Sequence, residues 1–397
     1  MEQTSLEQLI ARQEGRMLEF KREFDTDIVK EIVAFANTEG GVVLIGIDDD
    51  GAVVGLEDNL QRLEERIVNL CRSRCQPAIL PSIEMAQLEG KQILVVRVEE
   101  GRRKPYKANE VTYVRVGSTC RHADRDEEYR MFIESGEIVF EQTPVQGATF
   151  ADLDRPKLAQ YVELRAPGAV TVNKMSLERL SLRLGFVCEE GKELVPSVAG
   201  LLLFGQYPQL SLPQSGISAV RFLGTDLADP LLDRAEIEGT LDQLIVQAAQ
   251  FVRRNERVAA VFGKDFPRRT DVPEYPTWTV REVLANAVSH RDYSVQGQRV
   301  MLRMFDDRLE VFNPGGLMPG VTLEELERME VAPPRRNPLL VRVLREWGIV
   351  EEVGRGLARI RREMQEHGSG EPVFRADRRS FTVVLPARVL SKEELQG

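Results

Sequence analysis

Acidic side chains and one lysine near the start of the chain have the types and spacing of a phosphodiester-processing site. Glu14 and Glu19 precede Lys21 directly, and Asp48 and Asp49 follow an apolar run of strand length. If strand and helix pair, acids from both ends of this segment meet at one edge of a sheet. Carboxylates near a lysine can hold a divalent metal that polarises a phosphate and activates water. The same residues also fit a solvated rim of salt bridges, which contribute little to stability.

A second constellation lies in the last third of the chain. Glu282, Asn286 and His290 are spaced at i, i+4 and i+8, which places them on one face of a helix. A carboxylate that takes a proton from water, one turn from an amide oxygen that can hold Mg²⁺, is what ATP hydrolysis needs. Glycine-containing turns at 314–320 and 354–357 would let backbone amides approach adenine and phosphates. The sequence has no P-loop, so the common phosphate cradle is missing from it.

A run of basic residues offers a local path for phosphates. The net charge of −10 argues against a broad basic surface that coats nucleic acid without specificity. It leaves room for a basic groove of limited size. We predict such a groove at Arg102, Arg103, Lys104, Lys107, Arg115 and Arg121. The alternative is a charged hairpin that meets only solvent.

Length and composition are those of a multidomain globular protein. The 397 residues exceed one typical core, and 42% hydrophobic with 29% charged residues is an ordinary balance. No apolar run approaches the roughly 20 residues that span a bilayer. The four cysteines are scattered, which disfavours a structural zinc site and favours reduced thiols in a cytoplasmic protein.

Periodicity in the first third predicts an α+β domain with a mixed sheet. Apolar residues recur at helical spacing between strand-like runs and glycine-containing turns. The predicted elements are a helix at 27–37, a strand at 41–47, a helix at 58–75, a hairpin at 83–88 and 91–98, and a strand at 111–117.

The sequence pattern of the remaining chain predicts a small helical region in the middle and a second α/β region after it. The pattern at 176–205 predicts a helix, a turn and a second helix. These elements would form either a winged helix or a plain helical bridge. The further predicted elements are helices at 124–134, 154–165, 176–184 and 196–204, a strand at 215–224, a long helix at 234–262, a helix at 278–291, strands at 297–305 and 308–313, a helix at 322–329, two later helices split by a glycine-rich break, and a strand at 379–385.

Four ordered motifs in the first 135 residues resemble the Schlafen AlbA-like domain. They are E-x-x-x-x-E-F-K at 14–21, A-F-A-N-T-E-G-G at 34–41, L-I-G-I-D-D at 44–49 and Y-V-R-V-G-S-T at 113–119. Some Schlafen proteins cut tRNA or rRNA with three acids. By position, the resemblance implies that Glu14, Glu19 and Asp48 are catalytic metal ligands, with Lys21 as a catalytic partner. Nucleic-acid binding without cleavage and a protein-interaction role are the alternatives.

Three ordered motifs near the C-terminus resemble the GHKL nucleotide-binding superfamily. E-x-x-x-N-A-x-x-H at 282–290 is similar to its N-box, and N-P-G-G-L-M-P-G at 313–320 and V-G-R-G-L-A-R-I at 353–360 stand where its glycine boxes would be. The resemblance implies that Glu282 is the general base and that Asn286 binds Mg²⁺. An asparagine replaces the usual aspartate for adenine. The implied nucleotide-binding residues are Asn286, His290, Asn313, Gly315, Gly316, Gly354 and Gly356.

The two resemblances together imply an α+β multidomain protein of a known bacterial arrangement. Its divisions would be an AlbA-like domain at 1–135, a helical middle at 136–270 and a GHKL-like α/β sandwich at 271–390. Proteins of this arrangement are described as related to the C-terminus of RecG-type proteins.

The leading functional hypothesis is an ATP-binding effector in which nucleotide binding controls the AlbA-like domain. That domain binds, and in one version cleaves, tRNA-like RNA or DNA with Mg²⁺ or Mn²⁺. A homo-oligomer in host defence or stress response is expected. The alternatives are an ATP-responsive DNA-binding transcriptional regulator without cleavage, and an ATPase switch with a protein partner. As an enzyme, the chain would be an endoribonuclease, a weak ATPase, or both.

Overall fold

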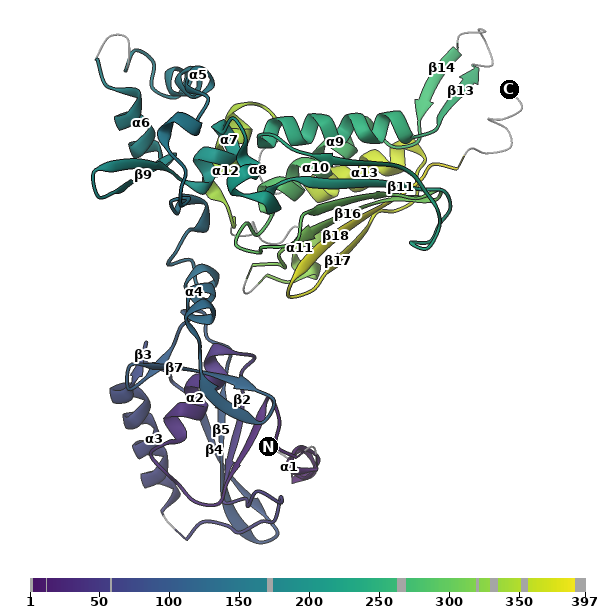
Figure 1. Cartoon of the computed structure of the whole chain (residues 1–397). Coiled ribbons are helices and arrows are strands. Elements are labelled where there is room, and N and C mark those ends of the chain that lie inside the picture. The colour runs from purple at the N-terminus through teal and green to yellow at the C-terminus, as the bar shows by residue number, and fades with distance from the viewer. Residues whose placement is uncertain are drawn as a thin grey trace. The chain divides into compact units, whose positions relative to one another are not determined.

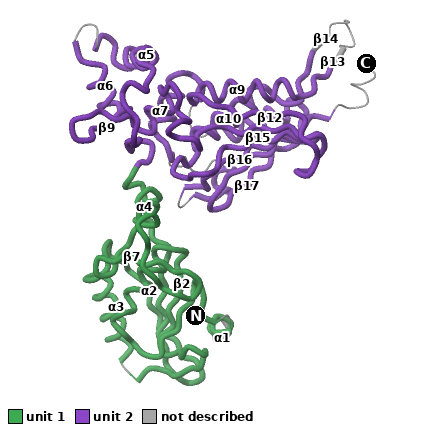
Figure 2. The backbone as a smooth tube through the Cα atoms, in the orientation of Figure 1, with its two compact units in different colours: residues 1–138 green, residues 139–397 purple. Residues whose placement is uncertain are grey.

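The chain forms two compact units in this computed structural model. Unit 1 comprises Met1–Ile138 and unit 2 comprises Val139–Gly397 (Figures 1 and 2). The structure describes residues 3–11, 13–57, 59–169, 174–262, 269–318, 321–328, 335–350 and 356–389. Each unit has its own hydrophobic core.

The first sheet of unit 1 explains the apolar runs near the N-terminus. Its strand order is β1 (Leu18–Lys21), β2 (Gly41–Ile45), β5 (Lys91–Val98) and β4 (Ser82–Leu88). β1 runs parallel to β2, and the other pairs are antiparallel. Helices α2 (Ile28–Asn37) and α3 (Leu60–Arg74) bury one face, and α1 (Gln3–Ile10) packs on the other. Because β2 is covered on both faces, nearly all of its residues are apolar.

A second sheet lies against the other side of α2. Its order is β3 (Cys75–Gln76), β6 (Lys107–Ala108), β7 (Val111–Val116) and β8 (Thr119–His122), all antiparallel. Helix α2 contacts β6, β7 and β8 as well as β2 and β5. Helix α4 (Arg125–Glu134) follows, with a capping box between Asp124 and Glu127. The helices and strands predicted here are confirmed within a few residues at each end.

Unit 2 is built on a six-stranded mixed sheet. Its order is β12 (Leu231–Ile237), β11 (Ile217–Phe222), β15 (Val300–Met304), β16 (Arg308–Pro314), β18 (Ser380–Pro386) and β17 (Val373–Ala376). β11 runs parallel to β15, and the other pairs are antiparallel. Helices α9 (Leu241–Asn255), α10 (Thr277–His290) and α13 (Gly356–His367) form a layer beside this sheet (Figure 1). This two-layer arrangement agrees with the predicted α/β sandwich.

The middle residues pack into the same core as the sheet of unit 2. They form η1 (Phe140–Gln142), η2 (Phe150–Asp152), α5 (Arg155–Arg165), α6 (Leu177–Leu184), the hairpin β9 (Val187–Glu190) and β10 (Glu193–Pro196), α7 (Val198–Phe204), α8 (Pro208–Ser211) and η3 (Pro213–Ser215). Helices α11 (Leu323–Arg328) and α12 (Pro338–Glu346) come later in the chain. Leu158 and Leu202 share one hydrophobic cluster with Leu284 and Leu340. The winged-helix alternative and the boundary at 270 stay predictions.

One predicted element is wrong. The long helix expected at 234–262 is divided into the end of β12, α9 and β13 (Val258–Phe262), which pairs with β14 (Arg269–Pro273). Gly239 has φ +131°, which L side chains rarely adopt, and Thr240 begins α9 with a capping box to Gln243. This turn prevents one continuous helix from forming across 234–262. The residues before it belong to β12, an edge strand of the sheet.

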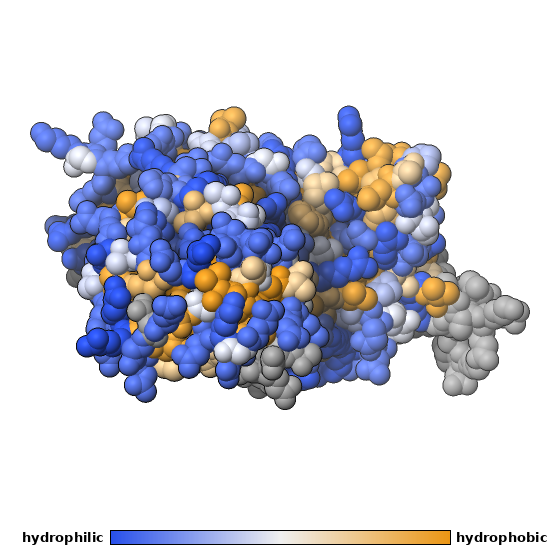
Figure 3. Space-filling view, turned by 90° about the horizontal axis from the view of Figure 1, so that it is seen from below, coloured by the Kyte–Doolittle hydropathy of each residue, from blue (hydrophilic) through white to orange (hydrophobic). Residues whose placement is uncertain are grey.

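Hydrophilic residues dominate the molecular face in Figure 3, where hydrophobic residues form separate patches. Within the described residues, no helix combines the length and apolarity needed to cross a membrane.

Candidate functional site

Three of the residues predicted to bind and hydrolyse ATP, Glu282, Asn286 and His290, lie on α10. This helix packs against α9, β16 and α13. Glu282 is only 6% exposed. The amide nitrogen of Asn286 donates a hydrogen bond of 3.1 Å to Oε1 of Glu282. With its nitrogen engaged, Asn286 has its amide oxygen to offer a cation such as Mg²⁺. His290 ends α10 with an exposed side chain.

Gly356 begins α13 directly against this pair. A Cβ at Gly356 would lie 3.0 Å from Oε1 of Glu282 and 3.6 Å from the amide nitrogen of Asn286. A residue without a side chain therefore keeps space beside the two polar groups. The first turn of a helix also presents backbone N–H groups that favour an anion. Gly354, the other glycine predicted in this segment, lies outside the described residues.

Asn313 brings a polar side chain into the buried face of β16. It alternates with Leu309 and Val311, which belong to the main core of unit 2. Asn313 is 5% exposed, and within the described part of the chain its Oδ1 atom has no hydrogen-bond partner. An unpaired buried acceptor costs roughly 1–3 kcal/mol. Such an atom fits a ligand that supplies a donor, such as the amino group of adenine.

The turn after β16 is fixed beside the end of α10. The backbone N–H of Asp292 donates to the carbonyl of Pro314 at 2.9 Å. Arg336 joins the carboxylate of Asp292 at 2.8 Å and the carbonyl of Gly316 at 2.9 Å. Gly315 has φ +111°, and a Cβ there would lie 2.7 Å from Cβ of Asp292. The predicted glycines thus serve a close approach of two backbone segments.

The acids predicted as a nuclease site in unit 1 are engaged by different partners. Glu19 accepts from Lys21 through Oε1 and from Arg115 through Oε2, both at 2.6 Å. Glu14 accepts from the backbone N–H of Phe20 at 2.8 Å. Asp48 instead pairs with Arg22, at 2.9 Å.

Sequence reasoning missed Glu31, an acid in helix α2, most of whose residues are buried and apolar. Its carboxylate binds Arg115 at 3.0 Å and lies 4.0 Å from Lys21. Burial, followed by the negative charge of Glu19, raises the pKa of Glu31. The signal was present as one acid amid buried residues, since such an acid needs a buried partner. Glu31, and not Asp48, shares its cationic partners with Glu19.

These contacts do not amount to a metal centre. Among the residues that the structure describes, no three His, Cys, Asp or Glu side chains are grouped so as to hold a metal ion. Both oxygens of Glu19 are paired with cations, and Asp48 has a partner of its own. The residues present therefore do not fit the predicted ion, and we derive no metal-dependent step from them.

The predicted basic groove is divided by burial. Arg102 and Arg103 are exposed in the loop before β6. Asn37, at the end of α2, holds this loop: its side chain donates to the carbonyls of Tyr106 and Tyr113 at 2.8 Å and accepts from the N–H of Tyr106 at 2.7 Å. The asparagine of the N-T-E-G-G motif is thus a positioning residue for the exposed arginines.

The other predicted groove residues are buried or paired. Arg115 is 4% exposed and Lys104 is 8% exposed, with Lys104 bonded to Glu100 at 2.7 Å. To reach a phosphate, Arg115 would have to leave the buried carboxylate of Glu19, and Lys104 the exposed carboxylate of Glu100. A phosphate contact for either residue stays a prediction. Lys107 and Arg121 lie nearer the surface and form ion pairs, at 3.4 Å with Glu128 and at 2.7 Å with Glu127 respectively.

Two family models match separate parts of the chain. Residues 14–124 match the model described as "Schlafen, AlbA_2". Residues 297–385 match the model described as "Putative ATP-dependent DNA helicase recG C-terminal". Both resemblances are confirmed. The AlbA_2 match contains the Glu19–Arg115 pair, and the RecG-type match contains Asn313 and begins just after α10.

Three solved structures that are similar to this chain have TM-scores below 0.5. The DIP2311 protein from Corynebacterium diphtheriae is 22% identical, with 97% of this chain and 80% of that chain covered and a TM-score of 0.46. The N-terminal domain of a RecG-related protein from Nitrosomonas europaea is 28% identical, covering 31% and 91%, with a TM-score of 0.24. The mycobacterial sensor histidine kinase MprB is 18% identical, covering 38% and 96%, with a TM-score of 0.20. No curated protein matches.

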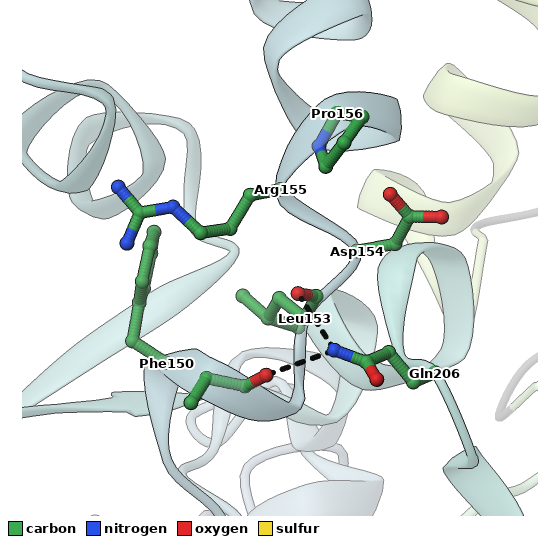
Figure 4. A pocket seen from close by; sticks show the side chains of 7 residues that line it. Phe150, Leu153, Asp154, Arg155, Pro156 and Gln206 are labelled. Atoms are coloured by element: carbon green, nitrogen blue, oxygen red, sulfur yellow. Dashed lines mark hydrogen bonds between the residues drawn. The ribbon is translucent and has the colours of Figure 1, made fainter.

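One hollow in unit 2, beside the start of α5, is lined by residues outside both matched ranges (Figure 4). Gln206 donates to the carbonyls of Ala151 and Leu153, at 3.0 and 3.5 Å. Asp154 accepts from a backbone N–H of α5, and Arg155 pairs with Glu178 at 2.8 Å. Because these polar groups already have partners, we assign no ligand to the hollow. Its other lining residues are Phe150 and Pro156.

Proposed function

We propose that this protein is an ATP-binding, nucleic-acid-binding effector, in which the RecG-type part binds ATP and the AlbA_2 domain binds RNA or DNA. The observation that carries the nucleotide assignment is the Glu282–Asn286 pair facing the side-chain-free start of α13. The AlbA_2 match and the exposed loop at Arg102 and Arg103 support the nucleic-acid assignment.

Each nucleotide-site residue has one role in this proposal. Mg²⁺ held by the amide oxygen of Asn286 would neutralise the phosphates. Glu282 accepts a proton from the water that attacks the terminal phosphate. The unpaired Oδ1 of Asn313 accepts from the adenine amino group. The backbone N–H groups at Gly356 face the phosphate charge.

The nucleotide assignment is tested by titrating the full chain with a fluorescent ATP analogue and by measuring phosphate release. Glu282→Gln should keep binding and lose turnover, because it changes only the proton acceptor. Asn286→Ala should weaken Mg²⁺-dependent binding about tenfold or more. Gln247→Ala, on the exposed side of α9, is the matched control. Equal affinity of Asn286→Ala and wild type would remove the assignment.

The nucleic-acid assignment is tested by mobility shifts on single-stranded RNA and duplex DNA over a range of salt concentrations. Replacing Arg102 and Arg103 with Ala should weaken binding and reduce the salt slope by about 0.7–0.9 for each phosphate that is no longer neutralised. The matched control is Arg62→Ala on α3, also exposed. A salt-independent shift, or no shift, would contradict the assignment.

Binding without cleavage is the better-supported form of this proposal. The carboxylate of Glu19 is bonded to two cations, and one of them is buried. Cleavage of RNA with Mg²⁺ or Mn²⁺ remains the competing form. Incubation of labelled tRNA with wild type and with Glu19→Gln decides between them. Cleavage products made only by the wild type would establish the competing form.

A further inference from the structure

Helix α12 is bound at its start by a residue far away in the chain. Glu141 is 0% exposed, and its two carboxylate oxygens accept from the backbone N–H groups of Leu339 at 2.6 Å and Leu340 at 2.8 Å. These N–H groups belong to the first turn of α12, which has no other helical acceptor for them. Glu141 sits in η1, close to Val139, where unit 2 begins.

The same end of α12 is tied to the nucleotide helix. Asn337 precedes α12, and its side-chain nitrogen donates to the carbonyls of Ser289 at 2.9 Å and Arg291 at 2.8 Å. These carbonyls lie at the end of α10, the helix that carries Glu282 and Asn286. A displacement of α10 along its axis therefore acts directly on the start of α12.

The other end of α12 is held by the middle helices. Tyr161 of α5 hydrogen-bonds to the carboxylate of Glu346. The Trp347 ring packs edge-on against the ring of Phe204 of α7, with 5.7 Å between the ring centroids. The Nζ atom of Lys157 lies over the Trp347 ring, 4.9 Å from its centroid. Helix α12 thus makes polar contacts with α10 at one end and with α5 at the other.

We propose that α12 transmits nucleotide occupancy from α10 to the segment 140–142, and that Glu141 is the positioning residue for this transfer. A buried carboxylate bonded to two backbone amides cannot slide past them without losing both hydrogen bonds. Segment 140–142 must therefore follow α12 or detach from it. Since this segment directly follows the AlbA_2-containing unit in the chain, nucleotide binding would bias how that unit engages nucleic acid. The inference rests on the proposed nucleotide site.

Amide hydrogen exchange with and without a non-hydrolysable ATP analogue tests the transfer. In the wild type, we expect changed exchange in α10 together with changed exchange at Leu339, Leu340 and 139–145. In Glu141→Gln, the response of α10 should remain and that of 139–145 should fall, because an uncharged amide accepts through one oxygen only. A response confined to α10 in the wild type would overturn the transfer alone. No response anywhere would overturn the proposed nucleotide site and, with it, the transfer.

The second readout is the ratio of nucleic-acid affinity with and without the analogue. The wild type should show a ratio of about five or more, the lower range of allosteric couplings. Glu141→Gln should bring the ratio close to one at unchanged nucleotide affinity. Tyr161→Phe, which keeps the ring in the core, should lower the ratio from the other end of α12. Glu366→Gln, exposed on α13, is the control and should keep the wild-type ratio. A wild-type ratio in both Glu141→Gln and Tyr161→Phe contradicts the inference.

Discussion

Arg115 donates a 2.6 Å hydrogen bond to Glu19 from a side chain that is almost fully enclosed. Its remaining donors reach Glu31 at 3.0 Å and the carbonyls of Gly15 and Leu18 at 2.9 and 3.0 Å. The guanidinium therefore joins β7 to α2 and to the start of β1. An ion network of this kind organises the AlbA_2 domain from within.

Removal of Arg115 should destabilise the AlbA_2 domain. Arg115→Ala leaves the carboxylates of Glu19 and Glu31 without their buried cation, with only the more exposed Lys21 beside them. We expect this to cost about 3–5 kcal/mol in urea unfolding. Arg121→Ala removes a more exposed ion pair and should cost no more than about 1 kcal/mol. Adding Glu31→Gln to Arg115→Ala should restore part of the loss. Equal midpoints for Arg115→Ala and Arg121→Ala would contradict the buried role.

A methyl group at Gly356 should lower the affinity for nucleotide without lowering the stability of the fold. Gly356→Ala adds a Cβ that would lie 3.0 Å from Oε1 of Glu282, so we expect nucleotide affinity to fall about tenfold. Alanine is also the better helix former, by up to about 1 kcal/mol, so the melting temperature should not fall. Calorimetric titration and thermal unfolding check the two halves. Loss of both stability and binding would indicate a general packing defect instead.

Asn313→Leu should show the same separation for a different reason. Leucine removes a buried acceptor that has no partner in the described structure, so stability should hold or rise by about 1 kcal/mol. Leucine cannot accept a hydrogen bond from adenine, so affinity for ATP should drop about tenfold or more. Affinity for the triphosphate tail alone, measured with inorganic triphosphate, should stay as in the wild type. Unchanged affinity for ATP would exclude Asn313 from the adenine site.

The stability contributed by Glu141 should depend on pH with a definite sign. Burial raises the pKa of this carboxyl from 4.5 to about 7, against the lowering effect of the N–H groups of Leu339 and Leu340. Between these values the folded state keeps a proton that the unfolded chain has released, so stability falls as pH rises from about 4.5 to about 7.

Glu141→Gln cannot titrate, so it provides the reference for this effect. The free energy of unfolding of the wild type minus that of the variant should decrease across this window by roughly 1–3 kcal/mol. Denaturant unfolding at a series of pH values measures the difference. A difference that rises with pH would contradict the raised pKa.

Local pattern and spacing predicted much of the fold and the contact between Glu282 and Asn286. The i, i+4 spacing of Glu282 and Asn286 was enough to place them together, because one helix fixes both. Glu31, Glu141 and Asn337 were missed because their partners lie on other elements. Glu141 and Leu339 are hydrogen-bonded although 198 positions separate them in the sequence. No local sequence pattern connects residues that far apart.

The ion-pair partner of Asp48 was missed for a similar reason. Asp48 follows β2, and its position at the strand end predicted a meeting with Glu19. The structure pairs it with Arg22 because that side chain follows the neighbouring strand β1, parallel to β2. The register of this strand pair decides which side chains meet. Glu19 lies opposite Val43 and Lys21 opposite Ile45, so Asp48 lies beyond the paired residues, and the apolar pattern did not contain that register.

The single core of unit 2 limits where the gene could be divided without exposing an apolar interior. A break near residue 138 would release two fragments that each retain their own apolar interior. A break near residue 270 would instead leave Leu202 on one translated piece and Leu284 on the other, with both faces open to water. A break between the two units would therefore preserve both interiors, whereas a break near residue 270 would divide the interior of unit 2.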